Sequence, residues 1–365
     1  MPTRAYLVQL FYVLSLTIFV FASGTTPLAS IATQYSLTTS TTLPFPTATL
    51  TSNDTDDFVV ADWSLSKGHI SNGEADLQFI DDPFPNNQVP VSDGSSSSSS
   101  NASVLRVTYP AGSFNNKTGG AQFYTLWNSS TPFQSMLISY ELAFDSGFDW
   151  VKGGKLPGIR GGPSVTGCSG GKEPNGTDCF STRLMWRTNG AGEVYAYIPT
   201  SDNICKDKEV ICNDDFGVSV QRGAFGFVAG QWSRVSLLVQ LNNPPSSSNG
   251  FIALYFNDVL AISQNGVQFR TSDSVTAGGF FLLVSTFTLH SKTKNTPDNY
   301  LRTFFGGDDS SWATPNDTHT YFRNIAMWGS SSPSTMSSSA HARAAEWSWV
   351  AFVTVLAFFC GLELV

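Results

Sequence analysis

The sequence predicts an all-β protein, a β-jelly roll or two-sheet sandwich. Charged residues make up only 13% of the 365 residues, whereas glycine and phenylalanine number 31 and 28. Short apolar or alternating runs are separated by turn residues, and long amphipathic helical periods are absent. A sandwich needs many short strands joined by tight turns, so the composition and the pattern agree.

Residues 1–23 are expected to form a secretory signal peptide. An apolar run over residues 5–22 follows Arg4, and Val20 and Ala22 stand where a cleavage site needs compact residues. A transmembrane anchor is the alternative, disfavoured because a Ser/Thr-rich stretch follows directly. Residues 24–56 are rich in Ser, Thr and Pro and poor in aliphatic side chains, so they predict a flexible, O-glycosylated arm.

Residues 57–330 are expected to form the β domain, with a disordered serine-rich loop at residues 93–100. A chain of this length can bury a full core. Asn257-Asp258 has the residues of a hairpin turn. Clear strand patterns occur at Ser135–Phe144, Trp232–Leu241, Phe251–Phe256, Val259–Ser263 and Gly279–Leu289.

The C-terminal end predicts a lipid anchor. Residues 331–346 form a serine-rich linker, and residues 347–365 hold an apolar run with no basic tail after it. This order matches a signal for glycosylphosphatidylinositol (GPI) attachment, with the attachment residue among Ser337, Ser338 and Ser339. A true tail anchor is the alternative, although the run is short for a membrane span.

Four of the five cysteines predict two disulfides, because Cys360 lies in the apolar C-terminal run. We favour Cys168–Cys179 and Cys205–Cys212, since both pairs close short local loops. Free thiols are the alternative, which secretion disfavours. The four histidines show no zinc-ligand spacing with these cysteines, so neither a metal nor another cofactor is expected.

Sequons for N-glycosylation add to the expectation of export. A single sequon is weak evidence in a chain rich in Ser and Thr, but several behind a signal peptide predict a secreted or surface-anchored glycoprotein. They begin at Asn53, Asn101, Asn116, Asn128, Asn175 and Asn316.

The candidate site is a predicted hairpin between residues 180 and 199. Side chains alternate along a strand, so Ser181, Arg183, Met185 and Arg187 share one face of the first strand, Phe180–Arg187. Tyr195 and Tyr197 share one face of the second strand, Val194–Pro199. The turn between them, residues 188–192, contains asparagine and two glycines. One face of the hairpin is thus apolar, and the other is suited to a wet groove.

Positive charge gathers around this hairpin. Residues 152–187 contain six basic and two acidic side chains, on a chain with a formal net charge of −8. A basic patch on an acidic protein predicts an anionic ligand, and it disfavours nucleic acid, whose binders are basic overall. A solvated charged face without function is the alternative. The basic side chains are Lys152, Lys155, Arg160, Lys172, Arg183 and Arg187.

Four stretches resemble polysaccharide lyase family 14, which contains alginate and glucuronan lyases. They read KGGKLPG, STRLMWR, YAYIP and FFGGDDSSWATPNDTHTYFRN, and the resemblance extends from about Trp63 to Trp328. The resemblance implies a jelly-roll enzyme that cleaves a polyuronate by β-elimination. The family's catalytic residues map to Lys155, Ser181, Arg183, Tyr195 and Tyr197.

The chemistry of elimination fits these residue types. The hydrogen on C5 of a uronate is removed next to a carboxylate, which needs a cation on the carboxylate, a base at C5 and an acid at the leaving O4. Arg183 offers a planar fork and Ser181 a further donor. Lys155, which we expect on a glycine-flanked loop, brings a point charge to the same carboxylate. Tyr195 or Tyr197 is expected to be the base, the acid or both, with its pKa lowered by the nearby cations.

Two other functions remain open from the sequence. A glycoside hydrolase needs two carboxyl groups across a groove, for which Glu141, Asp145, Asp149 and Glu193 are available. A non-catalytic carbohydrate-binding protein is the second, because jelly rolls also serve as lectins. For the lyase we expect Lys152 and Arg187 to bind neighbouring sugar units. We also expect a monomer that touches a membrane only through its lipid anchor.

Overall fold

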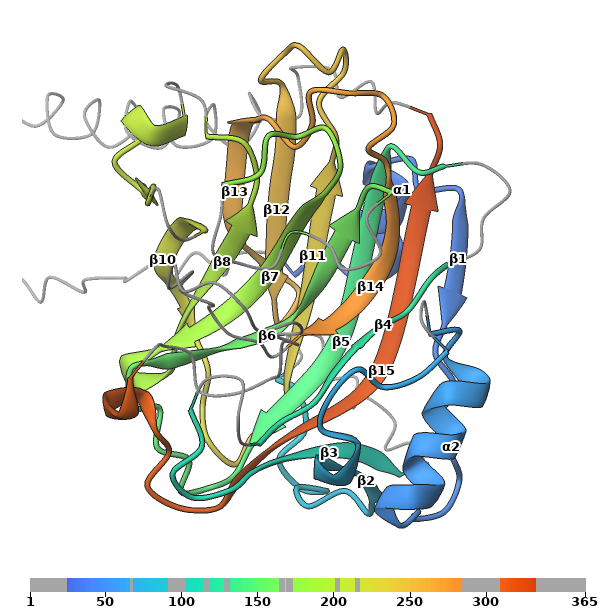
Figure 1. The fold of residues 1–365 in the computed structure, drawn as a ribbon, viewed down its shortest axis with the longest axis vertical. Coiled ribbons are helices and arrows are strands. Elements are labelled where there is room, and N and C mark those ends of the chain that lie inside the picture. Colours follow the sequence, from blue (N-terminus) through green and yellow to red (C-terminus); the bar gives the residue numbers. More distant parts are fainter. Residues whose placement is uncertain are drawn as a thin grey trace, which may run out of the picture.

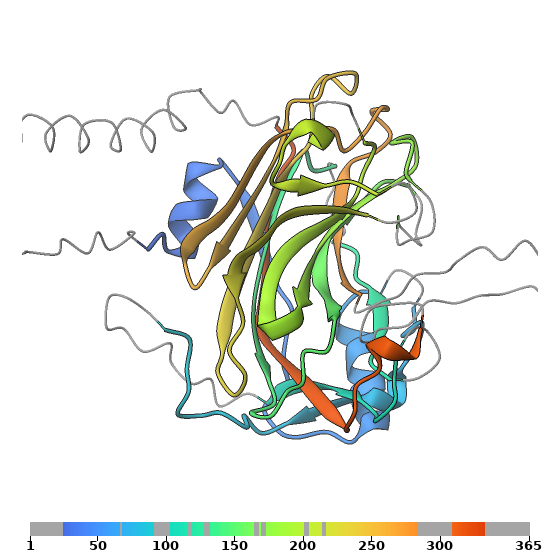
Figure 2. The ribbon, with the colours of Figure 1, turned by 90° about the vertical axis from the view of Figure 1, so that its left-hand side faces the viewer.

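The computed structural model describes residues 25–65, 68–90, 103–114, 119–127, 132–163, 168, 173–200, 204–213, 217–283 and 309–332. These residues form two antiparallel sheets that lie face to face as two layers (Figure 2). The prediction of an all-β jelly roll or sandwich is confirmed. The predicted signal peptide, the loop at 93–100, the linker beyond residue 332 and the GPI-type signal lie outside the described residues.

One sheet has eight strands in the order β13-β12-β11-β5-β15-β3-β2, and β1 pairs with β15 beside this path. The last strand along the chain, β15, therefore lies inside the sheet (Figure 1). The strands are β1 (Thr39–Thr42), β2 (Leu77–Ile80), β3 (Val104–Tyr109), β5 (Ser135–Phe144), β11 (Ser233–Gln240), β12 (Gly250–Phe256), β13 (Val259–Val267) and β15 (Thr318–Ser330).

The other sheet has seven strands in the order β4-β14-β6-β7-β8-β10-β9. They are β4 (Gln122–Tyr124), β6 (Gly153–Gly161), β7 (Phe180–Arg187), β8 (Ala191–Tyr197), β9 (Val210–Ile211), β10 (Val218–Gly226) and β14 (Ala277–Leu283). The strands β6, β7 and β8, which carry the candidate site, lie in the middle of this sheet, so neighbours on both sides fix their register (Figure 1).

The main core fills the space between the two sheets. Along β5, the inward side chains alternate with outward ones, and Met136, Ile138 and Tyr140 belong to the core. Along β7, Phe180, Leu184 and Trp186 face the same core, as the alternation predicts. The outer faces of both sheets carry buried polar and charged side chains, such as Glu141 on β5 and Arg183 on β7.

The prediction of a flexible arm over residues 24–56 is wrong. Residues Leu28–Gln34 form helix α1, which lies on the outer side of the eight-stranded sheet (Figure 2). Ile31 and Tyr35, one helical turn apart, pack against an apolar patch of that sheet made of Leu137, Leu238, Phe251, Ala253 and Tyr255. A few apolar residues suffice here because the surface that buries them comes from distant parts of the chain.

The rest of this N-terminal segment is also ordered. Strand β1 pairs with β15 in the register Thr39↔Gly329. Helix α2 (Ser52–Asp62) begins at Thr51, whose side chain accepts a hydrogen bond from the backbone N–H of Asp54. The folded domain therefore starts well before residue 57. Neither helix in the described part of the chain is long and apolar enough to cross a membrane.

The predicted strands and turn agree with the structure to within four residues at the ends that the structure describes. Phe180–Arg187 and Ser135–Phe144 have the predicted bounds. Asn257 and Asp258 form the turn between β12 and β13, both with positive φ, which Asn and Asp tolerate better than most residues. The predicted strand Gly279–Leu289 begins two residues earlier, at Ala277, and residues beyond Leu283 lie outside the described part.

Both predicted disulfides are present. Cys168 pairs with Cys179, and Cys205 pairs with Cys212, with Cα–Cα distances of 5.5 and 5.7 Å. Of the predicted sequons, Asn175 and Asn316 lie exposed outside regular structure, and Asn53 lies exposed in the first turn of α2. Asn101, Asn116 and Asn128 lie outside the described residues.

Candidate active site

The candidate site is built on the outer face of β6, β7 and β8. In the β7–β8 pairing, Arg183 lies opposite Tyr195, and Ser181 opposite Tyr197. The turn between the two strands contains Asn189 and Gly190, both with positive φ, as the residue types predict. The hairpin thus places an arginine beside a tyrosine on one face.

Lys155 reaches this face from within a strand, which corrects the prediction that it lies on a loop. It is part of β6 and pairs with Met185 of β7. A bulge between Lys155 and Gly158 offsets the register. Glycine is needed at 158, because a Cβ there would lie 1.9 Å from the carbonyl oxygen of Thr182. The glycines of the GGKLPG motif therefore allow β6 to pack closely on β7.

Lys155, Arg183, Tyr195 and Tyr197 converge on one spot. The Lys155 ammonium nitrogen lies 5.8 Å from the ring centroid of Tyr195 and 5.9 Å from that of Tyr197. The Arg183 guanidinium carbon lies 4.9 Å from the Tyr197 centroid. The two tyrosine rings meet edge to face at 5.6 Å. Two cations and two phenols thus share a space about one sugar unit wide.

This face is buried rather than wet. Lys155 and Tyr197 are each 1% exposed, Tyr195 is 5% exposed and Arg183 is fully buried. The disulfide residues Cys168 and Cys179 pack with Met185 and the two tyrosines. The expectation of an open groove is therefore wrong for this state of the protein, and a substrate must displace the groups that cover the cluster.

Ser181 connects the cluster to the disulfide. It is 1% exposed, and its hydroxyl donates a hydrogen bond of 2.5 Å to the carbonyl oxygen of Cys168. In this arrangement the Ser181 hydroxyl holds Cys168, which packs on the two tyrosines. Its predicted role as a donor to a substrate carboxylate requires that Cys168 first move away.

Burial and like charges change the acid–base properties of Lys155. Desolvation lowers the pKa of the Lys155 amine well below its ordinary value, and the positive charges of Arg183 and Arg187 lower it further. The neutral amine, which can accept a proton, is therefore accessible at a much lower pH than for an exposed lysine.

The pKa values of the two tyrosines are raised, whereas the sequence led us to expect them to be lowered. Desolvation raises the pKa of Tyr195, although a hydrogen bond from the backbone N–H of Gly217, at 2.8 Å, and the charges of Arg187 and Arg183 oppose it. Desolvation also raises the pKa of Tyr197, well above its ordinary value. The cations lower both pKa values, as expected, but burial outweighs them.

The two residues predicted for neighbouring sugar units lie at different places. The Arg187 guanidinium carbon is 5.7 Å from the Tyr195 centroid, at the edge of the cluster. Lys152 is exposed and lies outside the cluster, where its ammonium group hydrogen-bonds the Ser311 hydroxyl and sits 5.7 Å from the Trp312 ring. The structure thus joins Arg187 to the predicted catalytic residues and separates Lys152 from them.

Sequence reasoning missed the part that Glu193 plays in this face. Its carboxylate is fully buried on the same face of β8 as the two tyrosines. It accepts hydrogen bonds from Arg187, Arg222 and Ser219. The alternation that placed Tyr195 and Tyr197 extends to residue 193, so the pattern could have found it.

The chain matches a known protein family over most of the residues that form this site and the two sheets. The family profile of polysaccharide lyase 14 matches residues 97–299 and 287–325, which is more than half of the chain. The chain belongs to polysaccharide lyase family 14. The resemblance of the four sequence stretches is therefore confirmed, and the chain is a polysaccharide lyase by family. No curated protein sequence matches it.

Two solved structures show how far the likeness to other lyases extends. The alginate lyase of this family from Aplysia kurodai is 27% identical, aligns over 80% of this chain and 100% of its own, and has a TM-score of 0.59. A variant of alginate lyase Aly36B, solved with an alginate trisaccharide, is 16% identical, aligns over 80% and 98%, and has a TM-score of 0.54. The second likeness shows the fold alone.

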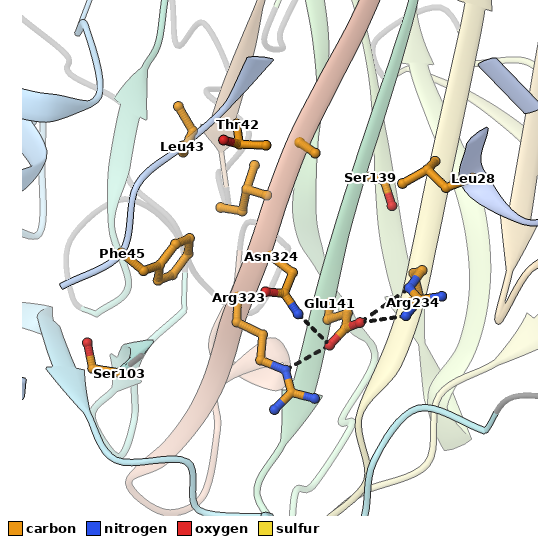
Figure 3. A pocket seen from close by; sticks show the side chains of 12 residues that line it. Leu28, Thr42, Leu43, Phe45, Ser103, Ser139, Glu141, Arg234, Arg323 and Asn324 are labelled. Atoms are coloured by element: carbon orange, nitrogen blue, oxygen red, sulfur yellow. Dashed lines mark hydrogen bonds and ion pairs between the residues drawn. The ribbon is translucent and has the colours of Figure 1, made fainter. Parts of the chain in front are cut away.

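Two of the carboxylates considered for hydrolysis, Glu141 and Glu193, do not meet in this lyase. Glu141 lies on the outer face of the other sheet, where it binds Arg234, Arg323 and Asn324 (Figure 3). Glu193 lies on the outer face of the seven-stranded sheet, so the two buried carboxylates are on opposite sides of the sandwich. In the part of the chain that the structure describes, no group of three or more His, Cys, Asp or Glu could hold a metal ion.

Asp145, another carboxylate considered for hydrolysis, also has structural partners. Its oxygens accept hydrogen bonds from the Tyr321 hydroxyl at 2.6 Å and from the backbone N–H of His319 at 2.8 Å. Burial would raise the pKa of Asp145, but the hydrogen bonds from His319 and Tyr321 outweigh it and lower the pKa overall. A carboxylate held ionised in this way suits an anchor between β5 and β15 better than a general acid.

Proposed function

We propose that the protein cleaves a polyuronate by β-elimination at the cluster of Lys155, Arg183, Tyr195 and Tyr197. The observation that carries this proposal is the convergence of these groups: the lysine amine lies within about 6 Å of both phenol rings, and the arginine lies 4.9 Å from the Tyr197 ring. Membership of the lyase family supports the same reaction.

The reaction needs one proton to leave C5 and another to reach O4. The Lys155 amine accepts the C5 proton, and the electron pair of that bond forms the C4–C5 double bond. The C4–O4 bond breaks, and the leaving oxygen takes the hydroxyl proton of Tyr195. Arg183 binds the uronate carboxylate, whose negative charge grows as C5 is deprotonated.

The directions of the pKa shifts support this division of roles. A base must be neutral before it acts, and burial together with Arg183 and Arg187 makes the neutral form of Lys155 accessible. An acid must hold its proton, as burial ensures for Tyr195. Of the two tyrosines, Tyr195 is better placed to lose its proton in the transition state, because the Gly217 N–H stabilises its phenolate.

Alginate is the first substrate to test, and glucuronan is the second. The relative from Aplysia kurodai that shares 27% of its residues with this chain is an alginate lyase. We expect Arg187, at the edge of the cluster, to bind the next sugar unit, and Lys152 to bind a unit farther along the substrate chain.

An absorbance assay tests this function. The purified protein is incubated with alginate, glucuronan and pectate, and the ultraviolet absorbance of the unsaturated uronate product is followed. We expect the absorbance to rise with at least one polyuronate. New reducing ends without the chromophore would identify a hydrolase, and binding without any cleavage would identify a carbohydrate-binding protein.

We also propose that the protein is exported, glycosylated and held at the cell surface by a GPI anchor. The two terminal apolar segments and the exposed sequons at Asn175 and Asn316 support this placement. A phosphatidylinositol-specific phospholipase should release the protein from cells. Retention on cells, with an intact C-terminal peptide that ends at Val365 found by mass spectrometry, would show a tail anchor instead.

A further inference from the structure

A buried carboxylate, Glu193, ties three strands together beside the proposed catalytic groups. One of its oxygens accepts a hydrogen bond from the Arg187 Nε at 2.8 Å, and the other accepts from Arg222 and Ser219, both at 2.6 Å. Arg187 comes from β7, and Ser219 and Arg222 come from β10. The link spans the strand that carries Tyr195.

We propose that Glu193 is a positioning residue for the elimination, which holds Arg187 against Tyr195 and balances the positive charge of the site. This inference rests on the proposed function. Arg187 lies 5.7 Å from the Tyr195 ring, with its Nε held by Glu193. A fully buried carboxylate bound by two arginines is costly to desolvate, so the ion pairs add little net stability relative to apolar residues, although removal of one partner alone is destabilising.

The charged and titratable side chains that share this face with Glu193 come from every neighbouring strand of the site. Lys155 lies on β6, Arg183 and Arg187 on β7, Tyr195 on β8 and Arg222 on β10. Glu193 forms ion pairs with Arg187, at the edge of the cluster, and with Arg222. The charge of Arg187 lowers the pKa of both Lys155 and Tyr195, so removal of its counter-ion Glu193 should favour the neutral form of Lys155 and the ionised form of Tyr195.

The test compares Glu193→Gln with Glu141→Gln. Glutamine has the shape of glutamate without its charge. Glu141 makes a good control because it is 2% exposed and also binds two arginines, but on the outer face of the other sheet (Figure 3). The readouts are the thermal midpoint of unfolding and the pH profile of kcat/KM, which reports the free enzyme.

We expect both variants to unfold at a lower temperature, and only E193Q to move the pH profile. With a negative charge gone, Lys155 loses its proton at a lower pH, so the acidic limb moves to lower pH. Tyr195 also ionises at a lower pH, so the alkaline limb moves the same way. Coulomb energies at an effective dielectric constant of about 20 predict a shift on the order of one pH unit.

Two outcomes would overturn the proposal. One is an E193Q profile with both limbs unmoved, and the other is an equal shift in E141Q. If E193Q does not fold, Arg222→Gln serves instead, because the Arg222 side chain is 42% exposed and its replacement should be tolerated. Its loss removes one positive charge from Glu193, so the net negative charge at Glu193 increases. Both limbs should then move to higher pH. Absence of lyase activity in the unaltered protein would instead refute the proposed function.

Discussion

Replacement of Lys155 by methionine should abolish most of the turnover and stabilise the fold. Methionine fills a similar volume without a charge. If Lys155 takes the C5 proton, kcat should fall by about 10²–10⁴-fold, the usual contribution of a general base. Because the amine is 1% exposed and lies beside two arginines, its removal should raise the free energy of unfolding by on the order of 1 kcal/mol.

The stabilisation should depend on pH. The pKa of Lys155 is lowered in the folded state, by burial and by the two arginines, so the unfolded chain binds more protons between the two pKa values. The stability of the unaltered protein therefore rises with pH through that window. The advantage of K155M should be largest on the acidic side and vanish at alkaline pH, as measured by denaturant unfolding.

Lys152→Met is the matched control for this experiment. It removes the same charge from an exposed position outside the cluster, so kcat should change little, while KM for long chains should rise. A K155M variant that keeps its turnover would show that the base lies elsewhere. A K155M variant that is less stable than the unaltered protein would show that Lys155 is needed for the fold.

Replacement of Tyr195 by phenylalanine is expected to lower kcat by about 10²–10⁴-fold with little change in KM. The ring and its contacts with Tyr197 remain, and only the hydroxyl that donates the proton is lost. The Gly217 N–H loses its acceptor, which should cost about 1–3 kcal/mol of stability. Steady-state kinetics on the substrate polymer and thermal unfolding measure the two effects.

Tyr197→Phe tests the assignment of the acid to Tyr195. Burial raises the pKa of Tyr197 well above its ordinary value, so its proton is harder to donate and the loss of kcat should be smaller. The reverse order of the two losses would move the acid to Tyr197. Full turnover in both variants would show that neither phenol transfers the proton.

The sequence predicted which side chains share a strand face in the site better than it predicted how the neighbouring strand β6 packs against them. Strand alternation grouped Arg183 with Ser181 and Tyr195 with Tyr197, because a period of two leaves only two choices, and the register of the hairpin then puts both pairs on one face. The position of Lys155 in a strand was missed, since a glycine-rich run with a proline resembles a loop. Its closeness to β7 depends on contacts between backbones, such as that of Gly158 with Thr182, which the sequence does not display.

Burial was the property that the sequence predicted least well. The polar face of β7 and β8 looked suited to water, but the disulfide residues Cys168 and Cys179 pack on it. The same error affected residues 24–56, whose composition looked unable to fold, although Ile31 is fully buried on a distant patch. In both cases the covering surface comes from elsewhere in the chain, and composition within a window cannot reveal it.

The central position of β15 has a consequence for the order in which the protein folds. This strand ends at Ser330 and pairs with β5, β3 and β1, so residues 39–42 have no partner strand until the end of the domain has been made. Pairings between such distant residues are slow to form. We therefore infer that the eight-stranded sheet closes only after residue 330 has been made, late in the synthesis of the chain.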